Sequence, residues 1–219
     1  MLVIFDLDGT LLNTIEDLTA ATNYALRCNG FAPRSVEECR RFVGNGVSKL
    51  LQRALPAGED TIEQVDRLRK DFVNYYDRHL WDSTFAYAGI EEVLNFCHAR
   101  AIKLAVASNK YQHATQRLVT HFFASTPFAA VLGQREGIPV KPHPQIVYDI
   151  LHRTQETAAG CLYVGDSPVD VQTAQNAGVR VCAVTWGFCP QAELAKCRPD
   201  YLLHTPPQLA EVLARLAAV

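Results

Sequence analysis

The sequence predicts an α/β fold: a doubly wound parallel sheet with a small all-helical domain inserted after the first strand. Short apolar runs alternate with amphipathic helical patterns from about residue 87 onward, which is typical of a parallel sheet covered by helices on both faces. Between residues 14 and 79 the pattern is almost entirely helical. We therefore expect an α/β core of residues 1–13 and 85–219 and a helical domain of residues 14–84.

Capping signals and glycines divide the helical domain into four helices. Thr14-Ile15-Glu16-Asp17 predicts a capping box for the first helix, which Asn29-Gly30 ends. Ser35 is expected to cap a second helix that runs to Phe42, and a third begins at Val47. A fourth helix is expected over residues 60–79, with an inward stripe of Ile62, Val65, Leu68, Phe72 and Tyr75.

The rest of the chain alternates helix and strand. After a first strand at residues 2–5, strands are expected at 102–107, 129–132, 161–165 and 179–184, with helices at 90–100, 112–122, 143–153 and 168–177. Tyr201-Leu202-Leu203 and a helix over 206–217 are expected to close one edge. In such sheets ligands bind beyond the carboxyl ends of the strands, near the point where the strand order switches.

Two carboxylates leave the first strand together. The apolar run Leu2-Val3-Ile4-Phe5 ends in Asp6-Leu7-Asp8-Gly9-Thr10. Burying two acids is costly, so such a pair usually has a cation, a proton or a chemical role. An ordinary Asp-Gly turn would explain Asp8-Gly9 but not Asp6, which stands where the strand should still be apolar. We interpret the pair as functional.

Three later segments supply what this pair needs for phosphoryl chemistry. Ser108-Asn109-Lys110 follows a predicted strand and offers a hydroxyl and backbone donors for a phosphate oxygen. Lys141-Pro142 places a cation in a stiffened turn. Gly165-Asp166-Ser167-Pro168-Val169-Asp170 returns two acids to a strand end and a helix start. Each segment alone has an ordinary explanation as a strand end, a solvated lysine or a helix cap, but the four together are specific.

In this order the four segments resemble the four motifs of the haloacid dehalogenase-like superfamily, in its phosphatase branch. The resemblance spans nearly the whole chain, because residues 14–84 have the size of the family's helical cap, and it implies a Rossmann-like core. The loop Phe42-Val43-Gly44-Asn45-Gly46-Val47 is similar to that of the phosphoglycolate phosphatases in this superfamily. Asn13-Thr14 stands where many relatives carry Asp-Ser, at the linker to the cap.

The resemblance implies catalytic and metal-binding roles for four acids. Asp6 would attack phosphorus and form an aspartyl-phosphate. Asp8 would protonate the leaving oxygen and then deprotonate the water that hydrolyses the intermediate. Mg2+ would be bound by the Asp6 carboxylate, the backbone carbonyl of Asp8 and Asp166, with Asp170 supporting the site or reaching the ion through water. The implied cofactor is therefore Mg2+.

The phosphate-binding set that the resemblance implies is Thr10, Ser108, Asn109 and Lys141, in which Thr10 orders the loop rather than reacts. No role is assigned to Lys110, which is adjacent in sequence only. A capped site favours a small phosphorylated metabolite as the partner, because the lid must close over the leaving group. We expect 2-phosphoglycolate as the substrate, contacted from the cap by Gly44, Asn45 and Gly46.

Two alternatives stay open. A sugar phosphomutase uses the same pair of acids but returns the phosphoryl group to substrate, and a catalytically idle binding module would keep the fold without turnover. A dehalogenase is disfavoured, since it needs no second acid such as Asp8.

Composition agrees with an enzyme acting on small molecules. The chain has 219 residues, of which 48% are hydrophobic and 20% charged, and these values are ordinary for a globular protein. A net charge of −2 provides no basic surface for nucleic acid, and no apolar run approaches a membrane span. The seven cysteines include no C-x-x-C pair, which favours reduced thiols and a cytoplasmic location. The sequence leaves the oligomeric state open.

Overall fold

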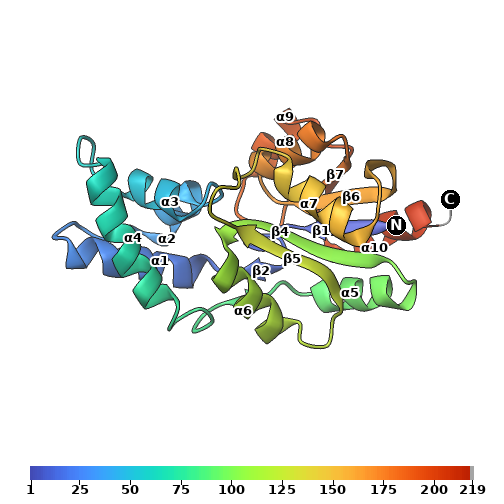
Figure 1. Ribbon diagram of the computed structural model, residues 1–219, viewed down its shortest axis with the longest axis horizontal. Coiled ribbons are helices and arrows are strands. Elements are labelled where there is room, and N and C mark those ends of the chain that lie inside the picture. Colours follow the sequence, from blue (N-terminus) through green and yellow to red (C-terminus); the bar gives the residue numbers. More distant parts are fainter. Residues whose placement is uncertain (218–219) are drawn as a thin grey trace.

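The computed structural model describes residues 1–217. A six-stranded parallel sheet forms the centre of the α/β core, which lies on the right in Figure 1. The strand order is β5-β4-β1-β6-β7-β8, in which every neighbouring pair is parallel. The strands are β1 (Leu2–Phe5), β4 (Lys103–Tyr111), β5 (Phe128–Gln134), β6 (Cys161–Gly165), β7 (Arg180–Val184) and β8 (Tyr201–Leu203). The expected α/β fold with a parallel sheet is confirmed.

Strand β1 occupies the middle of the sheet, where the strand order reverses. Its residues pair with Lys103–Val106 of β4 on one side and with Cys161–Val164 of β6 on the other. All four β1 side chains are fully buried, as their unbroken apolar run predicts. The Asp6 N–H donates to the Val164 carbonyl at 2.9 Å, so the chain leaves β1 at the carboxyl edge of the sheet. A ligand is expected at this edge.

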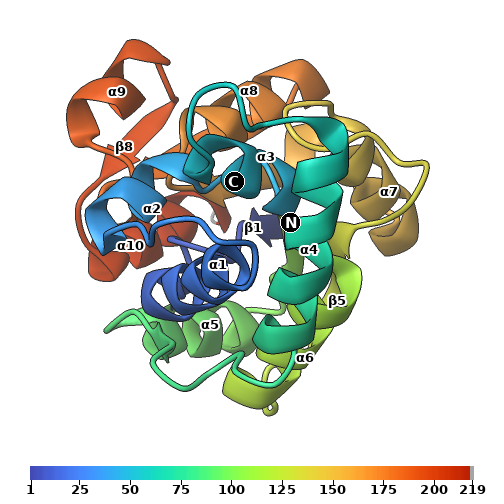
Figure 2. The same cartoon turned by 90° about the vertical axis from the view of Figure 1, so that its left-hand side faces the viewer.

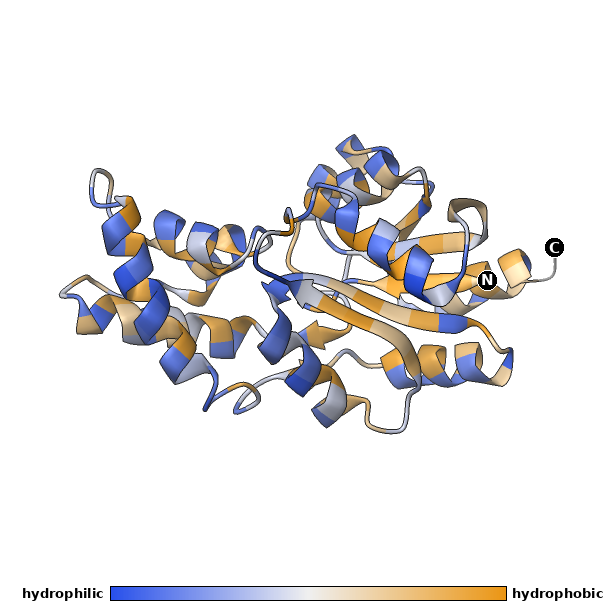
Figure 3. Ribbon diagram, viewed as in Figure 1, coloured by the Kyte–Doolittle hydropathy of each residue, from blue (hydrophilic) through white to orange (hydrophobic). Residues whose placement is uncertain are grey.

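Helices cover both faces of the sheet and bury two apolar clusters, and Figure 3 shows the strands as mostly hydrophobic between them. One cluster includes side chains from α5 (Ile90–Ala99), α6 (Gln112–Phe122) and α10 (Pro206–Ala217). The other includes side chains from α7 (Gln145–Thr154), α8 (Pro168–Ala177) and α9 (Gln191–Lys196), of which α9 was not expected. Among residues 1–217 there is no helix with the length and apolar character needed to cross a membrane.

Four helices, which we call the helical group, lie beyond the carboxyl ends of the strands (Figure 1). They are α1 (Ile15–Cys28), α2 (Val36–Phe42), α3 (Val47–Ala54) and α4 (Ile62–Tyr76). Seen end-on in Figure 2, they stand in front of the sheet, with β1 behind them. A short antiparallel pair, β2 (Leu12–Asn13) and β3 (Phe85–Ala86), lies where the chain leaves and re-enters the core. The exact division at residues 14–84 stays a prediction.

Two details of the helical group differ from expectation. Ser35 caps α2 as expected, and it does so through a capping box with Glu38. Thr14, for which a capping box was expected, makes no side-chain capping bond to α1. Its hydroxyl instead donates to Asp8 Oδ1 at 2.6 Å. The stripe on α4 is also shifted: Ile62 is 80% exposed because it starts the first turn, and Tyr76 rather than Tyr75 is fully buried.

Asp17 joins α1 to the segment that returns to the core. Its buried carboxylate accepts hydrogen bonds from the Ser83 N–H at 3.0 Å and from the N–H and hydroxyl of Thr84 at 2.9 and 2.7 Å. We expect Asp17→Ala to lower the free energy of unfolding by about 3 kcal/mol, since it removes the acceptor of the Ser83 N–H and of the buried N–H and hydroxyl of Thr84. Urea denaturation would measure this, with exposed Glu16→Ala as the matched control. Equal stabilities of the two variants would contradict it.

Candidate active site

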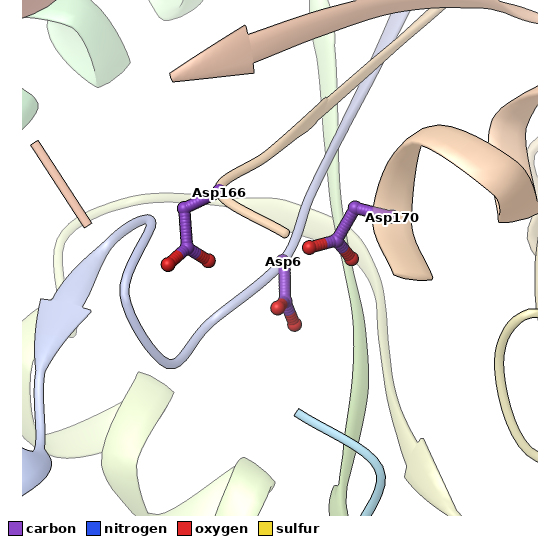
Figure 4. Close-up of side chains that lie close together, drawn as sticks. All are labelled: Asp6, Asp166 and Asp170. Carbon is purple, nitrogen blue, oxygen red and sulfur yellow. The ribbon is translucent and has the colours of Figure 1, made fainter. Parts of the chain in front are cut away.

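Three carboxylates meet at the carboxyl edge of the sheet (Figure 4). Asp6 follows β1, Asp166 follows the neighbouring strand β6, and Asp170 lies in the first turn of α8. One oxygen from each lies within 4.8 Å of the other two, and all three residues are buried. We call these residues the acid cluster. Adjacent parallel strands bring the first and last motifs together, as the sequence predicts.

Lys141 provides a buried cation beside the acid cluster. Its Nζ lies 2.7 Å from Asp170 Oδ1 and 2.9 Å from Asp6 Oδ1, and it donates to the Ala107 carbonyl and the Tyr163 hydroxyl at 2.9 and 3.0 Å. The contact with Asp6 is an ion pair without the alignment of a hydrogen bond. Among the described residues, Asp6 Oδ1 therefore has no hydrogen-bond donor.

The electrostatics of the acid cluster show an excess of negative charge. Burial and the Asp170 carboxylate raise the pKa of Asp6 to about 7, although Lys141 opposes this. Burial and the charges of Asp170 and Asp6 also raise the pKa of Asp166 well above its usual value. Burial alone would lower the pKa of Lys141, but Asp170 and Asp6 raise it well above its usual value, so the ammonium stays charged. A second cation would relieve this excess.

The Asp8 side chain turns to a different set of partners. Its Oδ1 accepts from the Thr14 hydroxyl at 2.6 Å and lies 3.2 Å from Lys110 Nζ. Lys110 is itself buried, and its Nζ donates to the Tyr76 hydroxyl at 2.8 Å. The two carboxylates of the first loop are thus held separately, Asp6 by Lys141 and Asp8 by Thr14 and Lys110.

Two loops fix Asp166 from either side. The Thr10 hydroxyl donates to its Oδ1 at 3.3 Å, and the Phe188 N–H donates to its Oδ2 at 2.7 Å. Trp186 Nε1 donates to the Thr10 carbonyl at 3.0 Å and joins the two loops. Gly9 packs against the same carboxylate, where a Cβ would collide with it, and its φ of +85° favours glycine. Thr10 therefore orders the first loop around Asp166.

Asn109 connects two motifs with the helical group. Its Oδ1 accepts from the Lys141 N–H at 2.9 Å, while its Nδ2 donates to the Lys141 and Gly44 carbonyls at 3.1 and 3.0 Å. Gly44 belongs to the loop between α2 and α3, which is thereby attached to the end of β4. The neighbouring Ser108 hydroxyl accepts from the Lys110 N–H at 3.2 Å.

A cavity of about 640 Å³ lies between the sheet edge and the helical group. From the core it is lined by Asp6, Asp8, Ser108, Asn109, Lys110 and Asp166, and from the helical group by Arg40, Arg41, Gly44, Asn45, Gly46 and Arg53, among others. Asn45 is held in place by Arg53, whose Nη2 donates to Asn45 Oδ1 at 2.8 Å. The volume is that of a small-molecule site.

Comparison with known proteins identifies the family. Residues 3–184 match the family described as haloacid dehalogenase-like hydrolase. The chain belongs to the haloacid dehalogenase-like hydrolase family. It is 34% identical to a phosphoglycolate phosphatase of Cereibacter sphaeroides, over 99% of both chains, and 33% identical to one of Pseudomonas fluorescens, over 92% of this chain and 75% of the relative. The crystal structure of a predicted phosphoglycolate phosphatase from Haemophilus somnus covers 97% of both chains at 28% identity, with a TM-score of 0.89.

The family membership confirms the resemblance and the expectation of a hydrolase. The structure brings together Asp6, Asp166, Asp170, Lys141 and Asn109 at one edge, as expected from the motif order. The Asp8 carboxylate is not part of the acid cluster and contacts Thr14 and Lys110 instead. Gly44, Asn45 and Gly46 line the same cavity.

Sequence reasoning missed Lys110 and Thr14 as partners of Asp8. Lys110 directly follows Ser108-Asn109, but a lysine after a strand is more often solvated than buried. The sequence around Thr14 predicts a helix cap, which is a different role from contacting Asp8. The Trp186–Phe188 segment, which holds Asp166 and the first loop, carried no signal of its own.

The raised pKa of Asp6 predicts how the metal-free hydrolase depends on pH. Since the folded-state pKa of about 7 exceeds the ordinary value of 3.8 for an aspartate, ionisation of Asp6 costs stability as pH rises between these values. We expect Asp6→Asn to raise the unfolding midpoint of EDTA-treated protein by several degrees at pH 8. The advantage of the variant should grow from about pH 4 to about pH 7 and then level off.

Thermal unfolding across this pH range would measure the difference. Asp149→Asn is a control of opposite sign: burial raises the pKa of Asp149, but hydrogen bonds from Gln145 and Arg135 lower it overall, so this variant should lose stability at neutral pH. A pH-independent difference between wild type and Asp6→Asn would contradict the account of Asp6.

Proposed function

We propose that this hydrolase is a Mg2+-dependent phosphatase that hydrolyses a small phosphate monoester, with 2-phosphoglycolate as its substrate, through a phosphoryl group carried on Asp6. The observation that carries the proposal is the meeting of Asp6, Lys141 and two further carboxylates beside a cavity of small-molecule size, which Asp6 and Asp166 line. The names of the relatives from Cereibacter sphaeroides and Pseudomonas fluorescens support the choice of substrate.

The residues present fit a Mg2+ ion. They offer oxygen ligands only, and buried Asp6 Oδ1 has no hydrogen-bond donor among the described residues. Asp6, the Asp8 backbone carbonyl and Asp166 would hold the ion. Asp170 is fully buried, does not line the cavity and pairs through Oδ1 with the Lys141 ammonium, which suits a supporting role or contact through water. The ion would neutralise charge on the substrate phosphate and so let a carboxylate approach it.

The chain's own residues then divide the reaction between them. Asp6 attacks phosphorus, while Asp8 donates a proton to the departing oxygen and later takes one from the attacking water. The same group can serve both steps, because the first leaves it ready to accept a proton. Ser108, Asn109 and Lys141 hold the phosphoryl oxygens, and Thr10 keeps the first loop in place through Asp166.

The helical group acts as the cap of this site. The bond from Asn109 to Gly44 places the α2–α3 loop over the cavity, where it restricts water. In 2-phosphoglycolate the group beyond the ester is a carboxylate, which needs a donor or a cation. Arg40 and Arg41 line that side of the cavity, and Asn45 offers its side-chain amide nitrogen while its oxygen accepts from Arg53.

The direct test is phosphate release from a panel of esters that includes 2-phosphoglycolate and hexose phosphates, with and without Mg2+. We expect turnover that requires Mg2+ and is fastest with 2-phosphoglycolate. Asp6→Asn should lower kcat by about 10³-fold or more, because it removes the nucleophile. As the control, Asp66→Asn makes the same substitution at an exposed position on α4 and should leave kcat unchanged.

Other outcomes would replace the proposal. Full activity of Asp6→Asn would exclude Asp6 as the nucleophile. Interconversion of hexose phosphates that requires a sugar bisphosphate, with no net phosphate release, would indicate a phosphomutase. A folded protein with no turnover in any arm would indicate an idle binding module.

The cap loop should determine substrate preference. We expect Asn45→Ala to raise KM for 2-phosphoglycolate about tenfold, with little change in kcat, because it removes a hydrogen bond to a charged group. KM for p-nitrophenyl phosphate, which lacks the carboxylate, should stay within about twofold. Steady-state kinetics on both esters would measure this, with exposed Asn74→Ala as the control. An unchanged KM for 2-phosphoglycolate would remove the loop from the substrate site.

A further inference from the structure

Lys110 is a buried cation that the proposed reaction leaves without a role. Lys110 follows Ser108-Asn109 near the end of β4. It is only 5% exposed, and it lines the cavity. Its Nζ lies 3.2 Å from Asp8 Oδ1 and donates to the Tyr76 hydroxyl at 2.8 Å. Burying an ammonium costs free energy unless its partners compensate, so this arrangement implies a use for the charge.

The partners of Lys110 come from two parts of the molecule. Asp8 belongs to the first loop of the core, whereas Tyr76 ends α4 of the helical group. The next residue, Asp77, is also docked on the core: its Oδ1 accepts from the Tyr111 hydroxyl and its carbonyl accepts from Arg117 Nη1, both at 2.6 Å. Tyr76 can therefore contact Lys110 only while the end of α4 is seated against β4 and α6.

The contacts on Asp8 fall on one oxygen. Both the Thr14 hydroxyl and Lys110 Nζ approach Oδ1, from 2.6 and 3.2 Å. Within residues 1–217, Oδ2 accepts no hydrogen bond, and the Asp8 side chain lines the cavity at 13% exposure. The hydrogen bond from Thr14 and the ion pair with Lys110 both engage Oδ1, which fixes the rotation of the carboxylate and leaves Oδ2 for proton transfer.

We propose that Lys110 is a positioning residue, which holds Asp8 with Oδ2 toward the leaving oxygen and makes this orientation depend on the Tyr76 contact from the seated α4. The inference rests on the proposed phosphatase function. Lys110 acts through Asp8 and touches neither the phosphoryl group nor the nucleophile, which Lys141 already serves.

Two substrates with different leaving groups separate this role from a structural one. The alkoxide of 2-phosphoglycolate needs a proton from Asp8, whereas p-nitrophenolate departs without one. The ratio kcat/KM reports the steps up to phosphoryl transfer, so it is insensitive to the later attack of water. We expect Lys110→Met to lower kcat/KM for 2-phosphoglycolate by about 30-fold, and that for p-nitrophenyl phosphate by less than about threefold. The first loss is smaller than the ~10²–10⁴-fold that general acid catalysis contributes, because Asp8 is still present and loses only its fixed orientation.

Further variants sharpen the comparison. Tyr76→Phe should also lower kcat/KM more for 2-phosphoglycolate than for p-nitrophenyl phosphate, but by less than Lys110→Met does. Lys110→Arg should retain part of the kcat/KM that Lys110→Met loses. Lys103→Met is the matched control, because it is the same substitution at the opposite end of β4, where Lys103 pairs with Glu156. In an Asp8→Asn background, Lys110→Met should cause no additional loss, since the group it positions is gone.

Each outcome decides between the two hypotheses. The positioning role would be overturned if Lys110→Met and Tyr76→Phe each lowered kcat/KM equally for both substrates. It would also be overturned if Lys110→Met lowered kcat/KM as much in the Asp8→Asn background as in the wild type. Either result would leave the proposed phosphatase function intact. If the wild type releases phosphate from neither ester, or Asp6→Asn keeps full activity, the proposed function fails instead. Unequal losses that disappear in the Asp8→Asn background would support the inference.

Discussion

One buried ion pair network holds the site together. Lys141 Nζ lies within 2.9 Å of both Asp6 and Asp170, and the Ala107 carbonyl and Tyr163 hydroxyl orient it. Taking a charge out of water costs several kcal/mol, so three carboxylates could not share this edge without a cation among them. Even with Lys141 present, burial and the Asp170 carboxylate raise the pKa of Asp6 to about 7, so one ammonium does not compensate for three buried acids. This residual charge is the physical basis for our proposal that the site binds Mg2+.

The end of β4 couples this charge network to the helical group. Three consecutive residues donate hydrogen bonds to the helical group and the residue that follows it. Asn109 donates to the Gly44 carbonyl, Lys110 to the Tyr76 hydroxyl and Tyr111 to the Asp77 carboxylate. Asn109 also brackets the backbone of Lys141 through two hydrogen bonds. The contacts that seat the helices and those that order the proposed phosphate site therefore come from the same short segment. This one segment therefore helps to form both the cavity and the proposed phosphate site.

The sequence predicted the acid cluster because Asp6 violates an ordinary pattern, and because Asp166 and Asp170 belong to a set of four segments that together resemble the family's motifs. An acid where an apolar strand should continue, such as Asp6, has few structural explanations, and parallel strands bring such positions to one edge. Thr14 and Lys110 could not be predicted in this way, because a helix cap and a solvated lysine explain them equally well. Only the fold reveals that both approach Asp8. Ile62 was misplaced for a related reason: helical periodicity assigns it to a face, but whether the first turn has a neighbour depends on tertiary packing.

The most direct test of the account is to trap the proposed phosphoryl group on Asp6. Wild-type protein would be mixed with Mg2+ and 2-phosphoglycolate, quenched in acid during the first turnovers and reduced with borohydride, which converts an acyl phosphate to an alcohol. Peptide mass spectrometry then locates the reduced side chain. The account predicts reduction at position 6, dependent on substrate and on Mg2+. Phosphate release with Asp6 unmodified at every time point, or reduction at Asp166 instead, would contradict it.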